Sequence, residues 1–83
     1  DPNLAIALAN SAIVDHRRED FAAARERNQR ALRLFEAADE PADAERAMTY
    51  ANLARSLQEL GRFDEAEQAY SRFAELARRT YGE

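Results

Sequence analysis

Residues 50–70 read YANLARSLQELGRFDEAEQAY, and this stretch decides the fold class. Its apolar side chains recur three or four positions apart, as Leu53 and Leu57 do, which is the spacing of one face of an α-helix. Gly61 interrupts the pattern and supplies the left-handed residue at which helices commonly end. A second helical pattern begins near Asp64. The stretch therefore predicts two helices joined by a tight turn and packed as an antiparallel hairpin.

The same unit occurs twice in the chain. A shift of 42 residues places Asn10 on Asn52 and Phe21 on Phe63. Such self-similarity at a fixed period is the signature of a repeat architecture. We therefore expect one module over residues 1–83, with repeats at about 1–40 and about 41–83, belonging to a longer array.

Start and stop signals divide the chain into four helices. Asp1-Pro2 opens the first, which should run to about His16, because Pro is favoured in the first turn of a helix. Asp20 can cap a second helix over roughly 21–38. Asp39-Glu40-Pro41 repeats the acidic-plus-Pro signal for a third, and the fourth runs from near Asp64 to about Thr80. The prediction is an all-α fold of four antiparallel helices in two helix-turn-helix repeats.

Composition narrows the function classes. The chain has 83 residues, no Cys and a net charge of −4, with Arg as its basic residue. The lack of Cys excludes disulfides and thiolate metal sites, and the negative charge disfavours nucleic acid. No apolar run approaches the length of a membrane span. We expect a cytoplasmic protein without a cofactor, a metal or a membrane partner.

The second repeat resembles the tetratricopeptide (TPR) signature. Tyr50-x-x-Leu53-Ala54-x-x-Leu57 supplies the aromatic, Leu and small residues of the first helix, and Ala66-x-x-x-Tyr70 supplies those of the second. The 42-residue period is longer than the usual ~34 and is similar to the kinesin light chain subtype. The resemblance implies a superhelix of helix pairs that binds protein or peptide partners. Ala54 and Ala66 would then lie where two helix axes approach closely.

The first repeat departs from this signature at four positions. Ser11 and Asp15 stand where the resemblance implies Leu and a large apolar residue, Asn28 replaces an aromatic residue, and Glu19 replaces Gly. A buried carboxylate without a partner costs several kcal/mol. We therefore expect Asp15 to reach Arg25, Asn28 or water.

The resemblance implies a peptide-binding groove on the concave side, built from the first helix of each repeat. Asn10 and Asn52 occupy the same position of the two repeats, and an amide can satisfy both the N–H and the C=O of an extended peptide. The alternative is that each Asn caps or packs a neighbouring helix. Ile6, Ile13 and Met48 could equally be core residues facing a further repeat. The complete predicted groove is Ile6, Ala9, Asn10, Ile13, Arg17, Met48, Ala51, Asn52, Arg55 and Glu59.

Two polar clusters can be interpreted either as solvated surface or as functional sites. His16, with Asp15 beside it and Asp20 one turn on, could suggest a metal or acid–base site, but the chain offers no second His, so we expect a solvated histidine at a helix end. The second helix is basic, and Glu26–Arg30 has the spacing of a surface ion pair, as has Glu75–Arg79. A solvated outer face explains these Arg residues better than an acidic or nucleic-acid partner.

The predicted function is a non-catalytic module that grips an extended protein segment on its concave face. The alternative is a structural spacer or a scaffold that associates with itself through stacked ends. The sequence does not identify the partner.

Overall fold

The computed structural model describes residues 2–38 and 41–82, which form four α-helices and no strand. The helices are α1 (Pro2–Arg17), α2 (Phe21–Ala37), α3 (Asp43–Glu59) and α4 (Phe63–Tyr81). The predicted all-helical class is confirmed, and the helix ends fall within one to three residues of those expected. Asp1, Asp39 and Glu40 lie outside the described residues.

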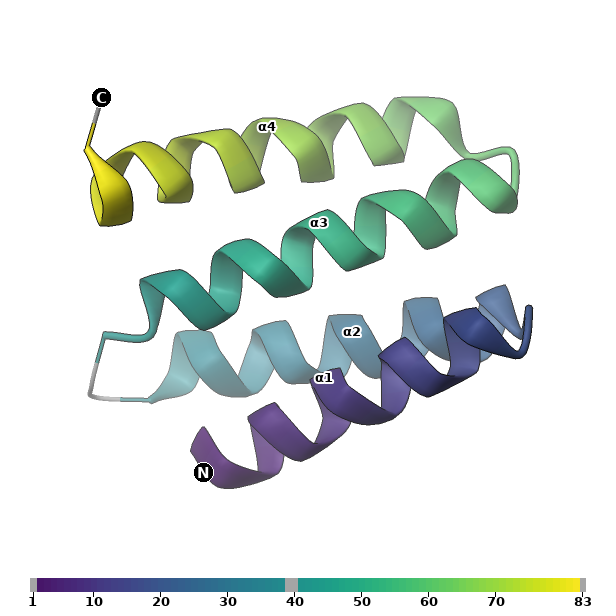
Figure 1. Cartoon of the computed structure of the whole chain (residues 1–83), viewed down its shortest axis with the longest axis horizontal. Coiled ribbons are helices and arrows are strands. Elements are labelled where there is room, and N and C mark those ends of the chain that lie inside the picture. Colours follow the sequence, from purple (N-terminus) through teal and green to yellow (C-terminus); the bar gives the residue numbers. More distant parts are fainter. Residues whose placement is uncertain (1, 39–40, 83) are drawn as a thin grey trace.

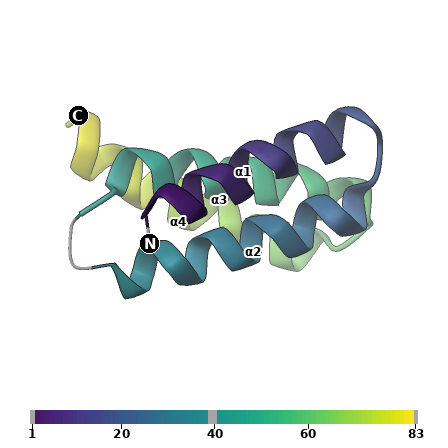
Figure 2. The ribbon, with the colours of Figure 1, turned by 90° about the horizontal axis from the view of Figure 1, so that it is seen from below.

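The helices form a slab measuring 31 × 28 × 17 Å in which neighbours run antiparallel (Figure 1). α1 packs on α2, α3 packs on α4, and the two pairs meet mainly through α2 and α3. α1 also touches α3, whereas α4 packs on α3 alone among the helices described. Seen from below, α1 lies on the face that Figure 1 turns to the viewer and α2 on the opposite face (Figure 2).

The turn between α3 and α4 closes as the Gly61 pattern predicts. The amide of Arg62 donates to the carbonyl of Leu57 at 2.8 Å, and the amide of Gly61 donates to that of Gln58 at 3.0 Å. Gly61 has a φ of 77°. This pair of bonds is a Schellman motif, which satisfies carbonyls that the end of the helix leaves free.

The turn between α1 and α2 has the same geometry without the glycine. The amide of Asp20 donates to the carbonyl of Asp15 at 2.8 Å, and the amide of Glu19 donates to that of His16 at 3.0 Å. Glu19 therefore adopts a φ of 62°, although a residue with a Cβ atom disfavours this region by about 1 kcal/mol or more. Asp20 then caps α2, its carboxylate accepting from the amide of Ala23 at 3.3 Å, as predicted.

The start of α3 differs from the prediction. The helix begins at Asp43, two residues after Pro41, and its N-cap residue is Ala42, which makes no capping bond through a side chain. Asp43 and Glu45 instead place acidic groups in the first turn, where the helix dipole favours negative charge. The acidic-plus-Pro signal located the connection but not the first helical residue.

The core consists of two clusters with alanines at the helix crossings. One cluster joins α2, α3 and α4, and Ala54 and Ala66 at its centre are 0% and 2% exposed. The small side chains let α3 and α4 approach closely. The other cluster joins α1 and α2 around Ala5, Ala31 and Phe35.

Tyr50 extends the first cluster at the surface and connects three helices. Its hydroxyl donates to Glu36 on α2 at 3.3 Å, and the guanidinium of Arg72 on α4 lies 5.7 Å from the centre of its ring. Hydrogen bonding to Tyr50 raises the pKa of Arg72 above its ordinary value.

An ion pair in the first hairpin occupies the place of an apolar contact in the second. Asp15 accepts from Arg27 at 2.6 Å, with 11% and 44% of the two side chains exposed. The sequence predicts Arg25, Asn28 or water as the partner of Asp15, and this prediction is wrong because the donor is Arg27. One repeat further on, the equivalent positions hold Leu57 and Ala69, which are 2% and 5% exposed.

The two ion pairs expected from i, i+4 spacing do not form among the residues described. Glu75 instead lies 3.7 Å from Arg72, and Arg79 lies 3.6 Å from Asp43 at the start of α3. Arg79 therefore connects the end of α4 to the start of α3. The exposed pair Arg72–Glu75 contributes only tenths of a kcal/mol to the free energy of unfolding.

Candidate functional site

α1 and α3 lie side by side on the face turned to the viewer in Figure 1, and a cavity opens between them. The cavity holds about 210 Å³, and we call it the apolar cavity. Ile6 and Met48, on its two sides, are 39% and 56% exposed, more than is usual for large apolar side chains in a core. The lining residues are Ile6, Ala9, Asn10, Ile13, Phe35, Glu45, Met48, Thr49 and Asn52.

A second cavity of about 160 Å³ continues along the same face, and we call it the polar cavity. The two cavities share Ile13 and Asn52, so together they form one groove between α1 and α3. The lining residues of the polar cavity are Ala12, Ile13, His16, Arg17, Asn28, Asn52 and Arg55.

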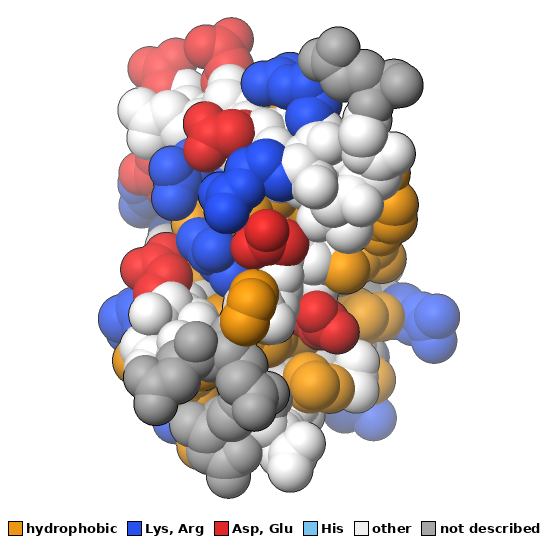
Figure 3. Space-filling model, turned by 90° about the vertical axis from the view of Figure 1, so that its left-hand side faces the viewer, with side chains coloured by type: hydrophobic (Ala, Val, Ile, Leu, Met, Phe, Trp, Pro, Cys, Tyr) orange, Lys and Arg blue, Asp and Glu red, His pale blue; other side chains and the backbone are white. Residues whose placement is uncertain are grey.

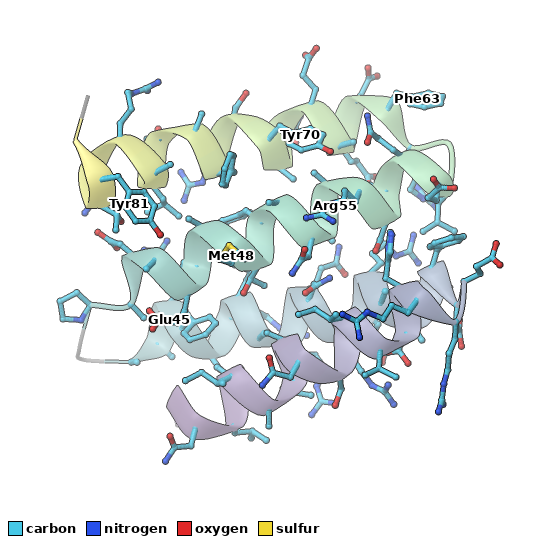
Figure 4. All side chains as sticks on the ribbon, viewed as in Figure 1. Glu45, Met48, Arg55, Phe63, Tyr70 and Tyr81 are labelled. Atoms are coloured by element: carbon cyan, nitrogen blue, oxygen red, sulfur yellow. The ribbon has the colours of Figure 1, made fainter. Side chains whose placement is uncertain are left out.

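The groove is chemically different at its two ends. Glu45, Met48 and Arg55 follow one another along α3 (Figure 4). Figure 3 views the slab from the end near the α2–α3 connection and shows hydrophobic side chains gathered toward the face that bears the groove. The groove therefore runs from an acidic side chain across an apolar floor to a basic region.

The polar cavity contains charge and hydrogen-bonding capacity that the described residues leave unused. Arg17 and Arg55 are exposed and form no ion pair or hydrogen bond within the described chain. Asn28 is 1% exposed, and its Oδ1 atom accepts no hydrogen bond there. A buried acceptor without a donor costs about 1–3 kcal/mol. A ligand that brings both a negative group and a donor would satisfy this cavity.

His16 is half-buried, so the prediction of a solvated histidine is wrong. Its Nδ1 atom and the hydroxyl of Ser56, which is 0% exposed, lie 3.2 Å apart in a hydrogen bond whose donor depends on the tautomer. Its ring meets Phe21 edge to face at a centroid distance of 5.1 Å. His16 therefore fixes the end of α1 against α3 and closes one side of the polar cavity.

The structure brings together all of the predicted groove residues except Ala51 and Glu59, which line neither cavity. Ala51 is the repeat equivalent of Ala9, which lies between α1 and α3. One repeat later, the equivalent flank of α3 faces away from α1. The repeat comparison selects the same positions on α1 and α3. Two helices that face one another, however, contribute opposite flanks to the groove between them. It missed Ala12, His16, Asn28, Phe35, Glu45 and Thr49.

Comparison with protein-family models, with curated proteins and with solved structures finds no match for this chain. Within the described residues, no group of three or more His, Asp or Glu is arranged to hold a metal ion. None of the helices described is long and apolar enough to cross a membrane.

A larger cavity of about 320 Å³ lies at the end of the slab between α2, α3 and α4. It is lined by two arginines, Arg46 and Arg79, but Asp43 lies 3.6 Å from each of them. Because Asp43 pairs with both arginines and Glu36 also lines the cavity, two acidic groups offset the two positive charges, and the cavity is a weaker candidate for an anionic ligand than the groove.

The basic residues of α2 do not act as one surface. Arg27 is committed to Asp15, whereas Arg30 and Arg33 are exposed and Arg25 is half-buried. The two exposed residues lie on α2, outside both cavities of the groove. Substitutions of Arg30 and Arg33 are therefore suitable controls for substitutions in the groove.

Proposed function

We propose that the chain is a non-catalytic, TPR-type module that binds an extended segment of another protein in the groove between α1 and α3. The observation that carries this proposal is the pair of adjoining cavities that share Asn52. A continuous groove with an apolar part and a charged part suits an extended peptide, whose successive side chains enter separate pockets.

The two asparagines support a role in holding a peptide backbone. Asn10 is exposed at the apolar cavity, and Asn52 is half-buried where the two cavities meet. Neither side chain forms a hydrogen bond within the described residues. Each amide is therefore available to donate to a peptide carbonyl and to accept from a peptide N–H.

The lining chemistry suggests the composition of the bound segment. An apolar side chain would enter the apolar cavity between Ile6 and Met48. A carboxylate would occupy the polar cavity, where Arg17 and Arg55 offer paired N–H donors. An N–H group of the same segment would satisfy Oδ1 of Asn28. The proposed ligand is thus a segment that combines a large apolar residue with an acidic residue.

The packing supports a TPR-type arrangement of the hairpins. Both hairpins close with the same pair of backbone hydrogen bonds, and buried alanines lie at the crossing of each helix pair. In such an arrangement the first helix of each unit lines the binding face. We place the module in the cytoplasm, with a protein partner and without a cofactor or nucleic acid.

The alternative function is a spacer or a self-associating scaffold. Three exposed apolar residues favour it, Leu4 and Val14 on α1 and Tyr81 on α4, and none of them lines either cavity of the groove. The two functions are therefore compatible, and different residues test them.

The test begins with random peptides displayed on phage and selected on the immobilised chain. Selected peptides should carry an apolar and an acidic residue, and their Kd is measured by fluorescence anisotropy. Asn52→Ala should weaken binding about tenfold through the loss of hydrogen bonds to the peptide backbone. Arg55→Ala should weaken it by a similar factor through the loss of a charged hydrogen bond to the carboxylate of the peptide. Circular dichroism should show unchanged helicity in both variants.

The matched control is Arg30→Ala, which removes an exposed arginine from α2 and should leave Kd unchanged. The proposal is wrong if the selected peptides respond to Arg30→Ala or Arg33→Ala and ignore substitution of both Asn10 and Asn52. The basic surface of α2 would then be the binding surface.

A further inference from the structure

Repeat-equivalent positions on α2 and α4 differ in burial. Within the chain, α3 and α1 cover a face of α2 whose four residues are between 0% and 6% exposed: Asn28, Ala31, Leu32 and Phe35. A shift of one repeat gives the matching residues of α4, all of which are only partly buried: Tyr70, Phe73, Ala74 and Ala77. Tyr81, one turn on, is 72% exposed. α4 therefore presents a surface of the kind that a helix covers on α2.

The first helices of the two repeats show the opposite difference. On α3, three residues of the face buried against α1 and α2 are between 0% and 6% exposed: Thr49, Leu53 and Ser56. Their equivalents on α1 are exposed: Ala7, Ser11 and Val14. Leu4, on the same stripe of α1, is 47% exposed and Val14 is 44% exposed. α1 therefore presents a surface of the kind that α3 buries against α2.

We propose that the α1 edge of one copy of this chain packs on the α4 edge of a second copy, and so repeats the α2–α3 contact between molecules. α1 and α4 form the two opposite edges of the slab (Figure 1). The α2–α3 contact shows which helix covers such a surface, and α1 carries the same register of positions as α3. The inference is independent of the groove, because none of the four residues of this α1 stripe lines either groove cavity.

Burying these edges requires no greater loss of polar hydration than the α2–α3 contact. That contact already buries three polar side chains, Asn28, Thr49 and Ser56. Their equivalents at the edges are Tyr70, Ala7 and Val14, so two of the three positions become apolar. In the other direction, Ser11 stands at the position of Leu53, so the edges bury two polar side chains, Tyr70 and Ser11, where the α2–α3 contact buries three.

The proposed contact joins two different surfaces, so a bound pair still offers one free α1 edge on one copy and one free α4 edge on the other. Such a heterologous contact does not stop at a dimer and continues into an open chain or a ring. Association should therefore increase steadily with concentration, unlike that of a two-fold symmetric dimer.

Sedimentation velocity of the 83-residue chain, from micromolar to millimolar concentration, tests this proposal. Val14→Arg blocks the α1 edge and Ala74→Arg blocks the α4 edge, with charges of the same sign so that the two blocked edges repel. Ala22→Arg, at an exposed position of α2 outside both edges, is the matched control. Circular dichroism checks that all three variants remain helical.

The average mass of the unmodified chain and of Ala22→Arg should rise beyond that of a dimer. Each edge variant alone should remain monomeric, and an equimolar mixture of the two should form a one-to-one dimer at least tenfold more tightly than either alone. A chain that stays monomeric at every concentration would overturn the proposal. So would a dimer that persists in Ala74→Arg alone, since that dimer would use the α1 edge symmetrically.

Discussion

Removing Arg27 should destabilise the protein, and removing Asp15 as well should restore its stability. Arg27→Ala leaves the Asp15 carboxylate, which is 11% exposed, without its 2.6 Å partner. Breaking a fully buried pair costs ~3–5 kcal/mol, and the 44% exposure of Arg27 reduces this figure, so we expect about 2 kcal/mol. For a chain of this size, that loss lowers Tm by roughly 8 °C or more.

The double substitution Asp15→Leu/Arg27→Ala reproduces the contact that Leu57 and Ala69 form one repeat later. Burying a leucine gains ~1.5–3 kcal/mol, which offsets the lost ion pair, so the double variant should match or exceed the unmodified chain. Asp15→Leu alone should change stability by less than ~1 kcal/mol, because Arg27 can reach water.

Urea unfolding followed by circular dichroism measures all four members of this double-mutant cycle. The reasoning fails if Arg27→Ala unfolds within ~0.5 kcal/mol of the unmodified chain, or if the double variant is as unstable as Arg27→Ala. The first result would mean that Asp15 finds another partner, and the second that the first hairpin does not accept the apolar contact of the second in place of its ion pair.

Three further substitutions test the turns and the helix crossing. Glu19→Gly should raise the free energy of unfolding by about 1 kcal/mol, because Glu19 has a φ of 62°; an unchanged urea midpoint would show that the strain is absent. Gly61→Ala should cost a similar amount through the backbone alone, since nothing lies within 4 Å of the added Cβ; stabilisation would contradict the left-handed turn. Ala54→Leu, at 0% exposure, should overpack the α3–α4 crossing by about 1–3 kcal/mol, and an unchanged Tm would refute the close approach.

Local signals in the sequence were sufficient to predict the helices and the turns. Gly61 and Asp20 act within a few residues of themselves, so the turn and the cap follow from residue type. The start of α3 was predicted less well because Ala42 has no side-chain oxygen and carries no capping signal. The superhelical arrangement of the hairpins stays a prediction.

Contacts between helices were harder to predict, because they depend on the register of the hairpin. Asp15 could reach several donors from its sequence position, and only the packing of α1 on α2 selects Arg27. The repeat itself contains the information, since Leu57 and Ala69 meet at the equivalent positions. The same limit applies to His16, whose partner Ser56 is 40 residues away.

The groove residues were predicted on α1 but less well on α3. A repeat comparison assigns the same positions to both helices, so it selects the same flank of each. Two helices that face one another contribute opposite flanks, which places Glu45 and Thr49 in the groove and leaves Ala51 and Glu59 outside it. Whether the residues brought together bind a peptide is the subject of the proposed selection.

Among the helices described, α4 packs closely only on α3, and this affects the order in which the structure opens. Detaching α4 uncovers one side of α3 and leaves the contacts among α1, α2 and α3 in place, so a partly open form loses one helix without losing the groove. α2 cannot leave in this way, because it packs on both α1 and α3. Transient opening at the α4 edge therefore exposes α4 while the groove persists, and a helix that covers this edge would slow amide exchange along α4 and protect it from proteolysis.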